Sequence, residues 1–591
     1  MLKGISMDPE EQAQRGAGLV VWALFILRLM YLLPFTARFD LAGDECYYWD
    51  WGRRLDWGYY SKPPMIGWLM GLVGRLTSNS AFGVRLAPLV LGVFSLWLLY
   101  RLTARLFNAR AGLVAVALAA FSPANLALNL FFTIDAPLVL CWTGALIAGW
   151  MCLERPKAFA PWFWLTLAVG LGSLSKQMML VFPLLFIAFA ALTPERRAVL
   201  RNPRLWISVV VSLLFLTPVL YWNWRNGWVT LLHTGSHFET SGSPTLLDRL
   251  LTFLSFPASQ LGMFTPLTWI LLMAVIFGGL WKWRQAPDKE RYLVIFSAPA
   301  LIVFFLLALR QSVHPNWPAV FYISAFALTA GWLEGQAWPE LTKPWLLRWK
   351  KPALWVGAVM MLATYAAPFA IQPLGWAGTK DDLTARLRGW RTAGEAAGHM
   401  LEQVPRPDHT IVFAVGHREN ASEMAFYMPQ HPFVYRWFQD GKVESQYEIW
   451  PSPDDDDRKH WDGLVLVAQE QEDPTLLHQM DRWFKTTEKR GTILVPLGNG
   501  AVRFYRVYLV QDMQYWPHEK QPSGPDKAST SDKAEPAAAT NGPAVKAGPE
   551  EAKPAPTEGK PAPGAAADPK SNPAPAPEPP AAPAPAPAPK P

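Results

Sequence analysis

The chain has 591 residues, of which 51% are hydrophobic and 13% aromatic, and its net charge is +7. Only 17% of the residues are charged, whereas soluble globular proteins carry about 25%. These values exclude an ordinary soluble enzyme and a fibrous protein, and three cysteines are too few for a disulfide-stapled secreted scaffold. The basic residues form no aromatic-flanked stripe, so nucleic acid is not expected as a partner.

Apolar runs follow one another through the first 372 residues and predict a mostly α-helical bundle that crosses a membrane many times. Residues 1–17 are polar, and the first apolar run follows them without a small-residue cleavage site, which indicates a signal-anchor helix. We expect about eleven spans from runs of this length. They are predicted at residues 18–35, 82–100, 111–129, 136–153, 162–174, 178–192, 205–222, 263–281, 292–309, 316–333 and 353–372.

The lysines and arginines between these runs set the predicted orientation. With residues 1–17 in the cytoplasm, five short cytoplasmic loops hold 17 of them, against nine in the longer outer loops. The transmembrane domain is then residues 18–372, its long first outer loop is 37–81, and everything after 372 lies outside. Residues 64–77 are apolar but short, and we interpret them as an interfacial helix. A deformed transmembrane helix is the alternative and would invert every later loop.

Beyond residue 372 the sequence becomes polar. Residues 376–515 predict a small periplasmic α/β domain. It is expected to contain strands at 410–415, 463–467 and 502–509 and helices at 381–403 and 473–485, the second capped by Asp473. Residues 516–591 are rich in proline and alanine and predict a disordered tail, either a spacer or tether or a dispensable extension.

The first outer loop carries the densest cluster of chemically active residues. From Phe39 to Leu69 it reads FDLAGDECYYWDWGRRLDWGYYSKPPMIGWL. Its aromatic residues suit a membrane interface. That role does not explain the adjacent acids Asp44 and Glu45, because a carboxylate beside a bilayer is costly unless it is solvated or paired. Asp44 and Glu45 are therefore candidate catalytic residues.

Two further charges interrupt apolar segments at the predicted outer face. Asp135, in NLFFTIDAPL, stands at a helix start, where an N-cap is at least as good an interpretation as a catalytic role. Lys176, in GSLSKQMML, needs a counter-charge or an anionic ligand unless it snorkels to the interface. Both readings stay open for each residue.

Histidines and an arginine mark two other predicted outer loops. His233 and His237 are four residues apart with Glu239 nearby, a spacing that binds a divalent metal if the segment is helical, although two histidines alone are a weak signal. Arg310 and His314, in ALRQSVHPNWPAV, form a second outer turn, and arginine suits bidentate binding of phosphate. Under the predicted topology all these groups share one face, as expected of an outward-facing site.

An ordered set of motifs connects these residues. It consists of GDE-x-YYW at 43–49, LDWGYYSKPPMIGWL at 55–69, TIDAPL at 133–138, SLSKQ at 173–177 and HPNWPA at 314–319, and more weakly of ASEMAFYMP at 421–429 and SQYEIW at 445–450. The set resembles the bacterial glycosyltransferase family 39 proteins, relatives of protein O-mannosyltransferases and of the aminoarabinose transferases that modify lipid A. The resemblance implies a GT-C fold in the bacterial inner membrane. It also implies inverting transfer of a sugar from a polyprenyl phosphate carrier to an acceptor outside that membrane, either lipid A, another glycolipid or a protein.

The resemblance further implies roles for single residues. Asp44 matches the family's acid in the first outer loop, which acts as general base or orients the acceptor hydroxyl. Lys62 matches a contact to the carrier phosphate, and Asp135 and Lys176 match polar positions facing the same cavity. The aminoarabinose transferases have a metal-binding acid where this sequence has Ser61. We therefore carry over no metal site and assign no cofactor, with a divalent metal left as an alternative.

The remaining site predictions concern the donor and the acceptor. Charge stabilisation on the departing phosphate is expected from three cations, Lys62, Lys176 and Arg310. Substrate contacts are predicted for Tyr59, Tyr60, Asp135, His237 and His314. The apolar bundle offers membrane lipids and an isoprenoid chain a groove, and no Gly-rich phosphate loop for a nucleotide sugar is present.

Two other classes of function remain as alternatives. A transporter or lipid-linked sugar flippase suits many spans with internal charges, but it predicts repeated halves and charges near the bilayer midplane. The sequence shows no internal repeat, and its polar set lies toward one face. A non-enzymatic envelope scaffold leaves the Asp44–Glu45 pair unexplained.

Overall fold

The computed structural model describes residues 9–236, 245–338, 347–437, 443–455, 458–468 and 474–516. The tail predicted to be disordered lies outside these residues except for Trp516. The predicted helix cap Asp473 and the predicted site residue His237 also lie outside the described residues.

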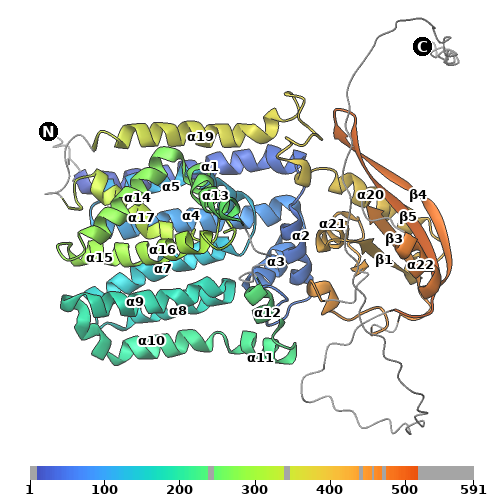
Figure 1. Cartoon of the computed structure of the whole chain (residues 1–591), viewed down its shortest axis with the longest axis horizontal. Helices are drawn as coiled ribbons and strands as arrows, with labels where there is room; N and C mark the ends of the chain where they lie inside the picture. Colours follow the sequence, from blue (N-terminus) through green and yellow to red (C-terminus); the bar gives the residue numbers. More distant parts are fainter. Residues whose placement is uncertain are drawn as a thin grey trace, which may run out of the picture. The chain divides into compact units, whose positions relative to one another are not determined.

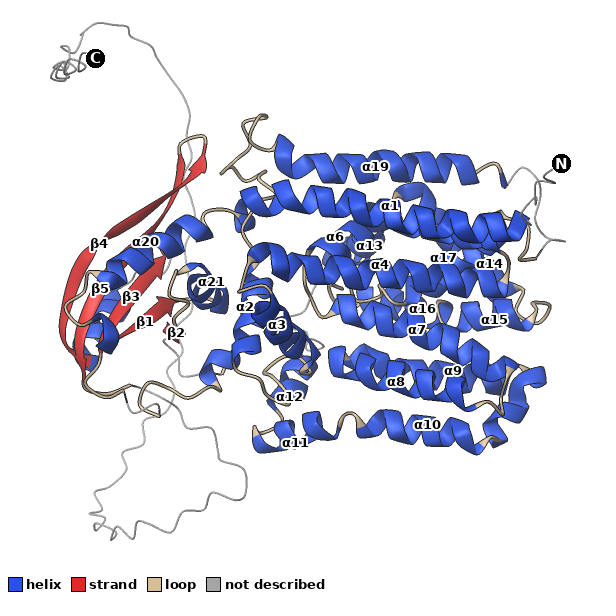
Figure 2. Ribbon diagram, turned by 180° about the vertical axis from the view of Figure 1, so that it is seen from behind, coloured by secondary structure: helices blue, strands red, loops and turns tan. Residues whose placement is uncertain are grey.

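The N-terminal part of the chain is helical, and most of its long helices run side by side (Figures 1 and 2). Its helices are α1 (Pro9–Arg38), α2 (Gly43–Arg53), α3 (Met65–Leu76), α4 (Ala81–Leu106), α5 (Ala109–Ala120), α6 (Pro123–Leu130), α7 (Asp135–Glu154), α8 (Phe159–Ser175), α9 (Val181–Leu192), α10 (Pro203–Leu214), α11 (Thr217–Arg225), α12 (Val229–Ser236), α13 (Leu246–Phe264), α14 (Pro266–Trp281), α15 (Asp288–Ile295), α16 (Ala298–Ala308), α17 (Phe321–Leu333) and α19 (Lys350–Ala370).

Several of these helices are suited to cross a membrane. Within the described ranges, six helical segments are long and apolar enough: α1, α4, α7, α19 and the successive pairs α10–α11 and α15–α16. There are up to eight if the bent pairs α5–α6 and α13–α14 each count as one span. Every predicted apolar run falls on one of these elements or on the shorter apolar helices α8, α9 and α17. The predicted multi-pass helical fold is thus confirmed, while the number of about eleven spans stays a prediction.

Local sequence explains the two bends. The Ser122 hydroxyl accepts a hydrogen bond from the backbone N–H of Asn125, and Pro123 occupies the first turn of α6. Thr265 has a φ of 65°, in the left-handed region, and Pro266 starts α14 directly after it. The run 111–129, predicted as one span, is therefore two helices that meet at 75°.

The first outer loop folds into α2 and α3, which pack against each other. On its other side α2 contacts α21 (Arg418–Tyr427) of the C-terminal domain. The Tyr47 hydroxyl accepts a hydrogen bond from the backbone N–H of Gln446 at 2.6 Å, and the Tyr427 hydroxyl accepts one from that of Leu41 at 2.6 Å. Buried side chains of α2, α3 and the C-terminal domain form one apolar cluster, so the loop and the domain share a core.

Within its described residues, the C-terminal domain is a five-stranded mixed sheet with three α-helices (Figure 2). The strands lie in the order β2-β1-β3-β5-β4, with β1 parallel to β2 and β3, and β5 antiparallel to β3 and β4. They are β1 (Thr410–Val415), β2 (Val434–Trp437), β3 (Asp462–Ala468), β4 (Phe484–Gly498) and β5 (Ala501–Met513), and the other helices are α20 (Trp390–Glu402) and α22 (Pro474–Trp483). The three predicted strands are present, whereas β2, β4 and α21 were not expected.

The predicted helix 381–403 is wrong over its first third. The helix α20 begins only at Trp390, and Gly389 before it has a φ of 87°, which glycine adopts without steric cost. Residues 376–388 form turns and a short 3-10 helix (Ala385–Leu387) instead, because the buried Asp382 carboxylate accepts hydrogen bonds from the backbone N–H groups of Gly378 and Thr384. Such local bonds from an aspartate compete with the helix.

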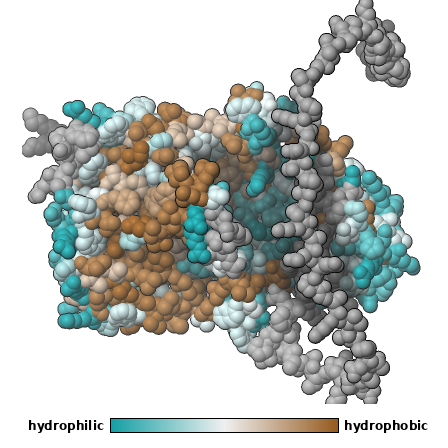
Figure 3. All heavy atoms as spheres, viewed as in Figure 1, coloured by the Kyte–Doolittle hydropathy of each residue, from teal (hydrophilic) through white to brown (hydrophobic). Residues whose placement is uncertain are grey.

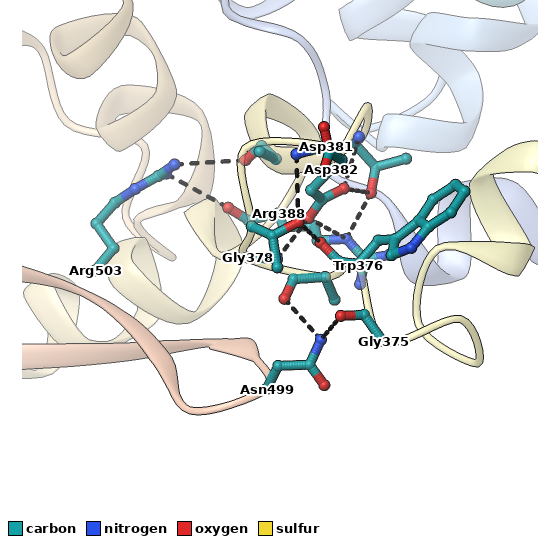
Figure 4. Close-up of polar contacts among 12 residues, drawn as sticks. Gly375, Trp376, Gly378, Asp381, Asp382, Arg388, Asn499 and Arg503 are labelled. Carbon is teal, nitrogen blue, oxygen red and sulfur yellow. Dashed lines mark hydrogen bonds and ion pairs between the residues drawn. The ribbon is translucent and has the colours of Figure 1, made fainter.

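Residues 375–388, the linker between α19 and α20, make polar contacts with the sheet (Figure 4). The Asn499 amide donates to the carbonyl oxygens of Gly375 and Ala377, and the Arg503 guanidinium donates to that of Arg388 at 3.5 Å. The pKa of Asp382 lies below its ordinary value. Burial alone would raise this pKa, but the hydrogen bonds from Thr384 and Gly378 and the charge of Arg388 lower it by more.

We expect Asp382→Asn to destabilise the protein by about 1–3 kcal/mol, because an amide replaces one acceptor oxygen with a donor that faces N–H groups. The contribution of the Asp382 carboxylate is present above the ordinary aspartate pKa and is lost as the pH falls through its lowered value. Thermal unfolding of the purified variant measures the change. Asp381→Asn, at the exposed neighbouring acid, is the matched control, and equal melting of both variants would contradict the prediction.

Candidate active site

A cavity of about 780 Å³ is lined by residues of both the helical region and the C-terminal region. Its volume lies in the usual range of ligand sites, about 300–1,000 Å³. Figure 3 shows hydrophobic residues over the helices, hydrophilic residues over the C-terminal domain, and a hydrophilic hollow between them. The apolar part of the lining comes from α4 to α7, α13 and α17 and includes Leu96, Leu99, Leu128, Val139, Phe264, Ile323 and Phe326. Both bent helix pairs border the cavity.

The polar part of the lining unites most of the predicted residues. It contains Asp44, Glu45, Ser61, Lys62, Asp135, Lys176, His233, His314, Asn316, Arg386 and Arg418. The chain therefore brings the first outer loop, the start of α7, the end of α8 and two arginines of the C-terminal region to one space.

Asp44 stands in the first turn of α2 and has a half-exposed side chain. Its carboxylate lies 3.6 Å from a guanidinium nitrogen of Arg418 on α21. No hydrogen bond to the Asp44 carboxylate occurs among the described residues, so its oxygens are open to a ligand in the cavity.

Lys62 lies in the loop before α3 and is largely covered. Burial lowers the pKa of its ammonium, the positive charge of Lys176 lowers it further, and Asp44 and Asp135 act in the opposite direction. Within the part of the chain that the structure describes, this ammonium makes no ion pair or hydrogen bond. A covered cation without a protein partner is a suitable place for an anion.

Asp135 and Lys176 pair with each other. Their oxygen and nitrogen are 2.8 Å apart, and the side chains are only 11% and 13% exposed. Asn316 donates to the other Asp135 oxygen at 2.7 Å. The carboxylate thus binds side chains across the cavity wall rather than capping its own helix, and Lys176 has a counter-charge rather than snorkelling to water. Lys176 is held there because α8 ends at Ser175 and Lys176 itself is extended.

Glu45 is fully buried, unlike its neighbour Asp44. It forms an ion pair of 3.1 Å with the equally buried Arg85 of α4. Its two oxygens also accept hydrogen bonds from the backbone N–H groups of Ala42 and Phe132. These contacts occupy both oxygens and tie the start of α2 to the segment before α7, so they favour a positioning role for Glu45.

Of the remaining predicted site residues that the structure describes, His314 lines the cavity, and Tyr59, Tyr60 and Arg310 do not. Tyr59 stacks on Trp51 at 4.3 Å between ring centroids, and Tyr60 packs on the ring of His233 at 4.7 Å, but neither tyrosine lines the cavity. Arg310 is exposed and also does not line it, whereas His314 does. The functional roles of these residues stay predictions, as does that of His237.

No group of three or more His, Cys, Asp or Glu side chains suited to a metal occurs among the described residues. Ser61, at the position where the resemblance to the aminoarabinose transferases implies an acid, lines the cavity. A serine hydroxyl is a poor substitute for a carboxylate as a ligand of divalent metals. The residues at this position therefore do not fit that metal site.

Four residues in or next to the site were not predicted from the sequence. Asn316 stands inside the motif HPNWPA, and Arg85 interrupts the predicted span 82–100, so both offered a signal. Arg386 and Arg418 belong to the C-terminal region, and nothing in the sequence indicates that they return to the first outer loop.

Known proteins are similar to this chain in sequence and in fold. Residues 61–222 match the family model described as dolichyl-phosphate-mannose-protein mannosyltransferase. The lipid A galacturonosyltransferase RgtD of Rhizobium johnstonii is 28% identical over 326 residues, which are 55% of this chain and 67% of that protein. The undecaprenyl phosphate-alpha-4-amino-4-deoxy-L-arabinose arabinosyl transferase 1 of Pseudomonas fluorescens is 23% identical over 557 residues, with 77% and 99% covered.

A solved structure shares the fold. ArnT from Cupriavidus metallidurans, bound to undecaprenyl phosphate, superposes with a TM-score of 0.56 at 16% identity, covering 83% of this chain and 97% of ArnT. The predicted GT-C fold is confirmed. This chain is thus a multi-pass membrane protein with a GT-C fold, similar in sequence to the protein mannosyltransferase family model and to transferases that act on lipid A or use an undecaprenyl phosphate-linked sugar.

Proposed function

We propose that this protein transfers a sugar from a polyprenyl phosphate carrier to a lipid A or lipopolysaccharide acceptor at the periplasmic face of the inner membrane. The names of the relatives support it: two are galacturonosyltransferases of lipid A or of the lipopolysaccharide core, and one is an arabinosyl transferase with an undecaprenyl phosphate-linked donor. The proposed orientation puts the first outer loop and residues 376–515 in the periplasm, in accordance with the Lys/Arg bias of the loops.

One observation carries the proposal: a single cavity combines apolar walls from the membrane helices with Asp44, Lys62 and the Asp135–Lys176 pair. A lipid-linked donor needs this combination, because its isoprenoid chain requires an apolar groove and its phosphate requires cations. A flippase would also need the groove, but it has no use for an open carboxylate beside the phosphate site.

The proposed reaction is a single displacement. The acceptor hydroxyl oxygen attacks the anomeric carbon while the bond from that carbon to the phosphate oxygen breaks. Asp44 takes the hydroxyl proton as general base. The bonding electrons leave with the polyprenyl phosphate, and attack from the opposite side inverts the anomeric configuration.

The leaving phosphate gains negative charge, which cations in a partly dehydrated site stabilise. Lys62 is the first candidate, because its ammonium has no protein partner among the described residues. Lys176 is the second, because its pairing with Asp135 holds it in the same cavity. Arg310 stays a predicted contact of the donor outside this cavity. We assign Glu45 the positioning of Asp44 rather than proton transfer.

The direct test uses the purified full-length protein, undecaprenyl phosphate-linked sugars and lipid A, with transfer detected by mass spectrometry. Envelope lipids from cells with and without the gene identify the natural product. Absence of transfer, together with unchanged envelope lipids, would contradict the proposed function.

We expect binding of undecaprenyl phosphate to weaken as the pH rises, because Lys62 must keep its proton to attract the phosphate. Its pKa lies below the ordinary 10.5, so the weakening begins at a lower pH than an exposed lysine would give. Tryptophan-fluorescence titrations from neutral pH to about pH 10 measure the dissociation constant. Lys62→Arg keeps the charge and should move the weakening to higher pH, and identical pH profiles would contradict this role.

A further inference from the structure

The cavity contains more positive charge than one phosphate requires. Among the described residues its lining has four cations, Lys62, Lys176, Arg386 and Arg418, and three acids. One of these acids, Glu45, is already neutralised by Arg85, which does not line the cavity. The surplus attracts a further negative group besides the donor phosphate.

Arg418 has few partners for a covered cation of this set. A guanidinium has five N–H donors, yet that of Arg418 donates no hydrogen bond among the described residues. Its closest partners are the Asp44 carboxylate at 3.6 Å and the ring of Tyr47 at 5.1 Å, the charge of Glu419 also acts on it, and its Nε atom is buried without a hydrogen-bond partner. Arg436 in the same domain differs, because it donates to Gly416, Glu444 and Glu448.

Arg386 reaches the same cavity from the linker and also makes no side-chain hydrogen bond or ion pair within the described ranges. The turns around Asp382 fix the backbone there. The C-terminal region thus presents two arginines beside Asp44 whose guanidinium groups donate no hydrogen bond among the described residues, although the charge of Glu419 acts on both. The two lysines belong to the helical region and its first loop.

We infer that the C-terminal domain completes the substrate site with a second anion-binding position, formed by Arg418 with Arg386, that holds a carboxylate or phosphate of the reacting partners beside Asp44. The inference rests on the proposed function and deepens it. Arginine suits both anions because its planar fork binds two oxygens at once. The anion is either a sugar carboxylate or an acceptor phosphate.

The experiment compares matched substrates on the purified full-length protein. For the donor, undecaprenyl phosphate-linked galacturonate is compared with galactose. For the acceptor, lipid A is compared with dephosphorylated lipid A. We expect the natural protein to prefer the anionic member of one pair in binding and in transfer, and Arg418→Gln to reduce that preference by about tenfold, the size of one charged hydrogen-bonded contact. Arg418→Lys should retain part of it, and Arg490→Gln, on β4 away from the cavity, all of it.

Binding of undecaprenyl phosphate without a sugar is the check on folding. It should be retained in Arg418→Gln and weakened much more strongly in Lys62→Gln. Loss of the preference within the donor pair assigns the arginines to the sugar, and loss within the acceptor pair assigns them to the acceptor. Equal preferences in the natural protein and in Arg418→Gln would overturn the inference and leave the proposed function intact. A natural protein that does not bind undecaprenyl phosphate would contradict the proposed function itself.

Discussion

Asp44→Asn is expected to lower the transfer rate by about 10²- to 10⁴-fold, the usual contribution of a general base. The amide has the shape of the carboxylate but cannot take a proton from the acceptor. Because Asp44 is half exposed and accepts no hydrogen bond among the described residues, its replacement should leave membrane insertion and melting temperature unchanged.

Binding of undecaprenyl phosphate gives this prediction a second readout. Removing a negative charge near Lys62 removes repulsion of the phosphate, so the dissociation constant should stay equal or fall. Asp381→Asn is the matched control, because Asp381 is exposed, does not line the cavity and accepts no hydrogen bond among the described residues. Full transfer by Asp44→Asn would remove Asp44 from the mechanism.

The helices were predictable because burial in a bilayer leaves long apolar runs in the sequence. Their bends were not, although Pro123 and Pro266 mark them, because a proline alone does not say whether a helix ends, kinks or continues. The C-terminal helix at 381–403 was overestimated for a related reason. The capture of backbone N–H groups by Asp382 is a local alternative that helical periodicity does not reveal.

The residues of the site, like the helices, include some that the sequence predicts and some that it does not. Asp44 and Lys176 were predictable because a charge beside a bilayer needs a solvating or paired environment, whereas Lys62 was predicted from the family resemblance. Their partners were not, since Arg418 meets Asp44 only through the packing of α21 on α2. The adjacent acids Asp44 and Glu45 looked equivalent in the sequence. Only the burial of Glu45 against Arg85 separates them.

Glu45→Gln tests whether Glu45 positions Asp44 rather than taking the proton itself. We expect it to destabilise the protein by about 3–5 kcal/mol, because it leaves the buried Arg85 charge without its counter-ion. One of the two oxygens that hold Ala42, Arg85 and Phe132 would also become a donor. Thermal unfolding in detergent measures the loss, and transfer should fall only as the folded fraction falls.

The double variant Glu45→Gln/Arg85→Met distinguishes a positioning role from a catalytic one. It removes both buried charges, so most of the lost stability should return, as expected when a buried ion pair is replaced as a unit. If Glu45 only positions Asp44, transfer should return with it. A Glu45→Gln variant that melts like the natural protein but transfers no sugar would make Glu45 the proton acceptor, and Asp44 would then keep only the orientation of the acceptor hydroxyl.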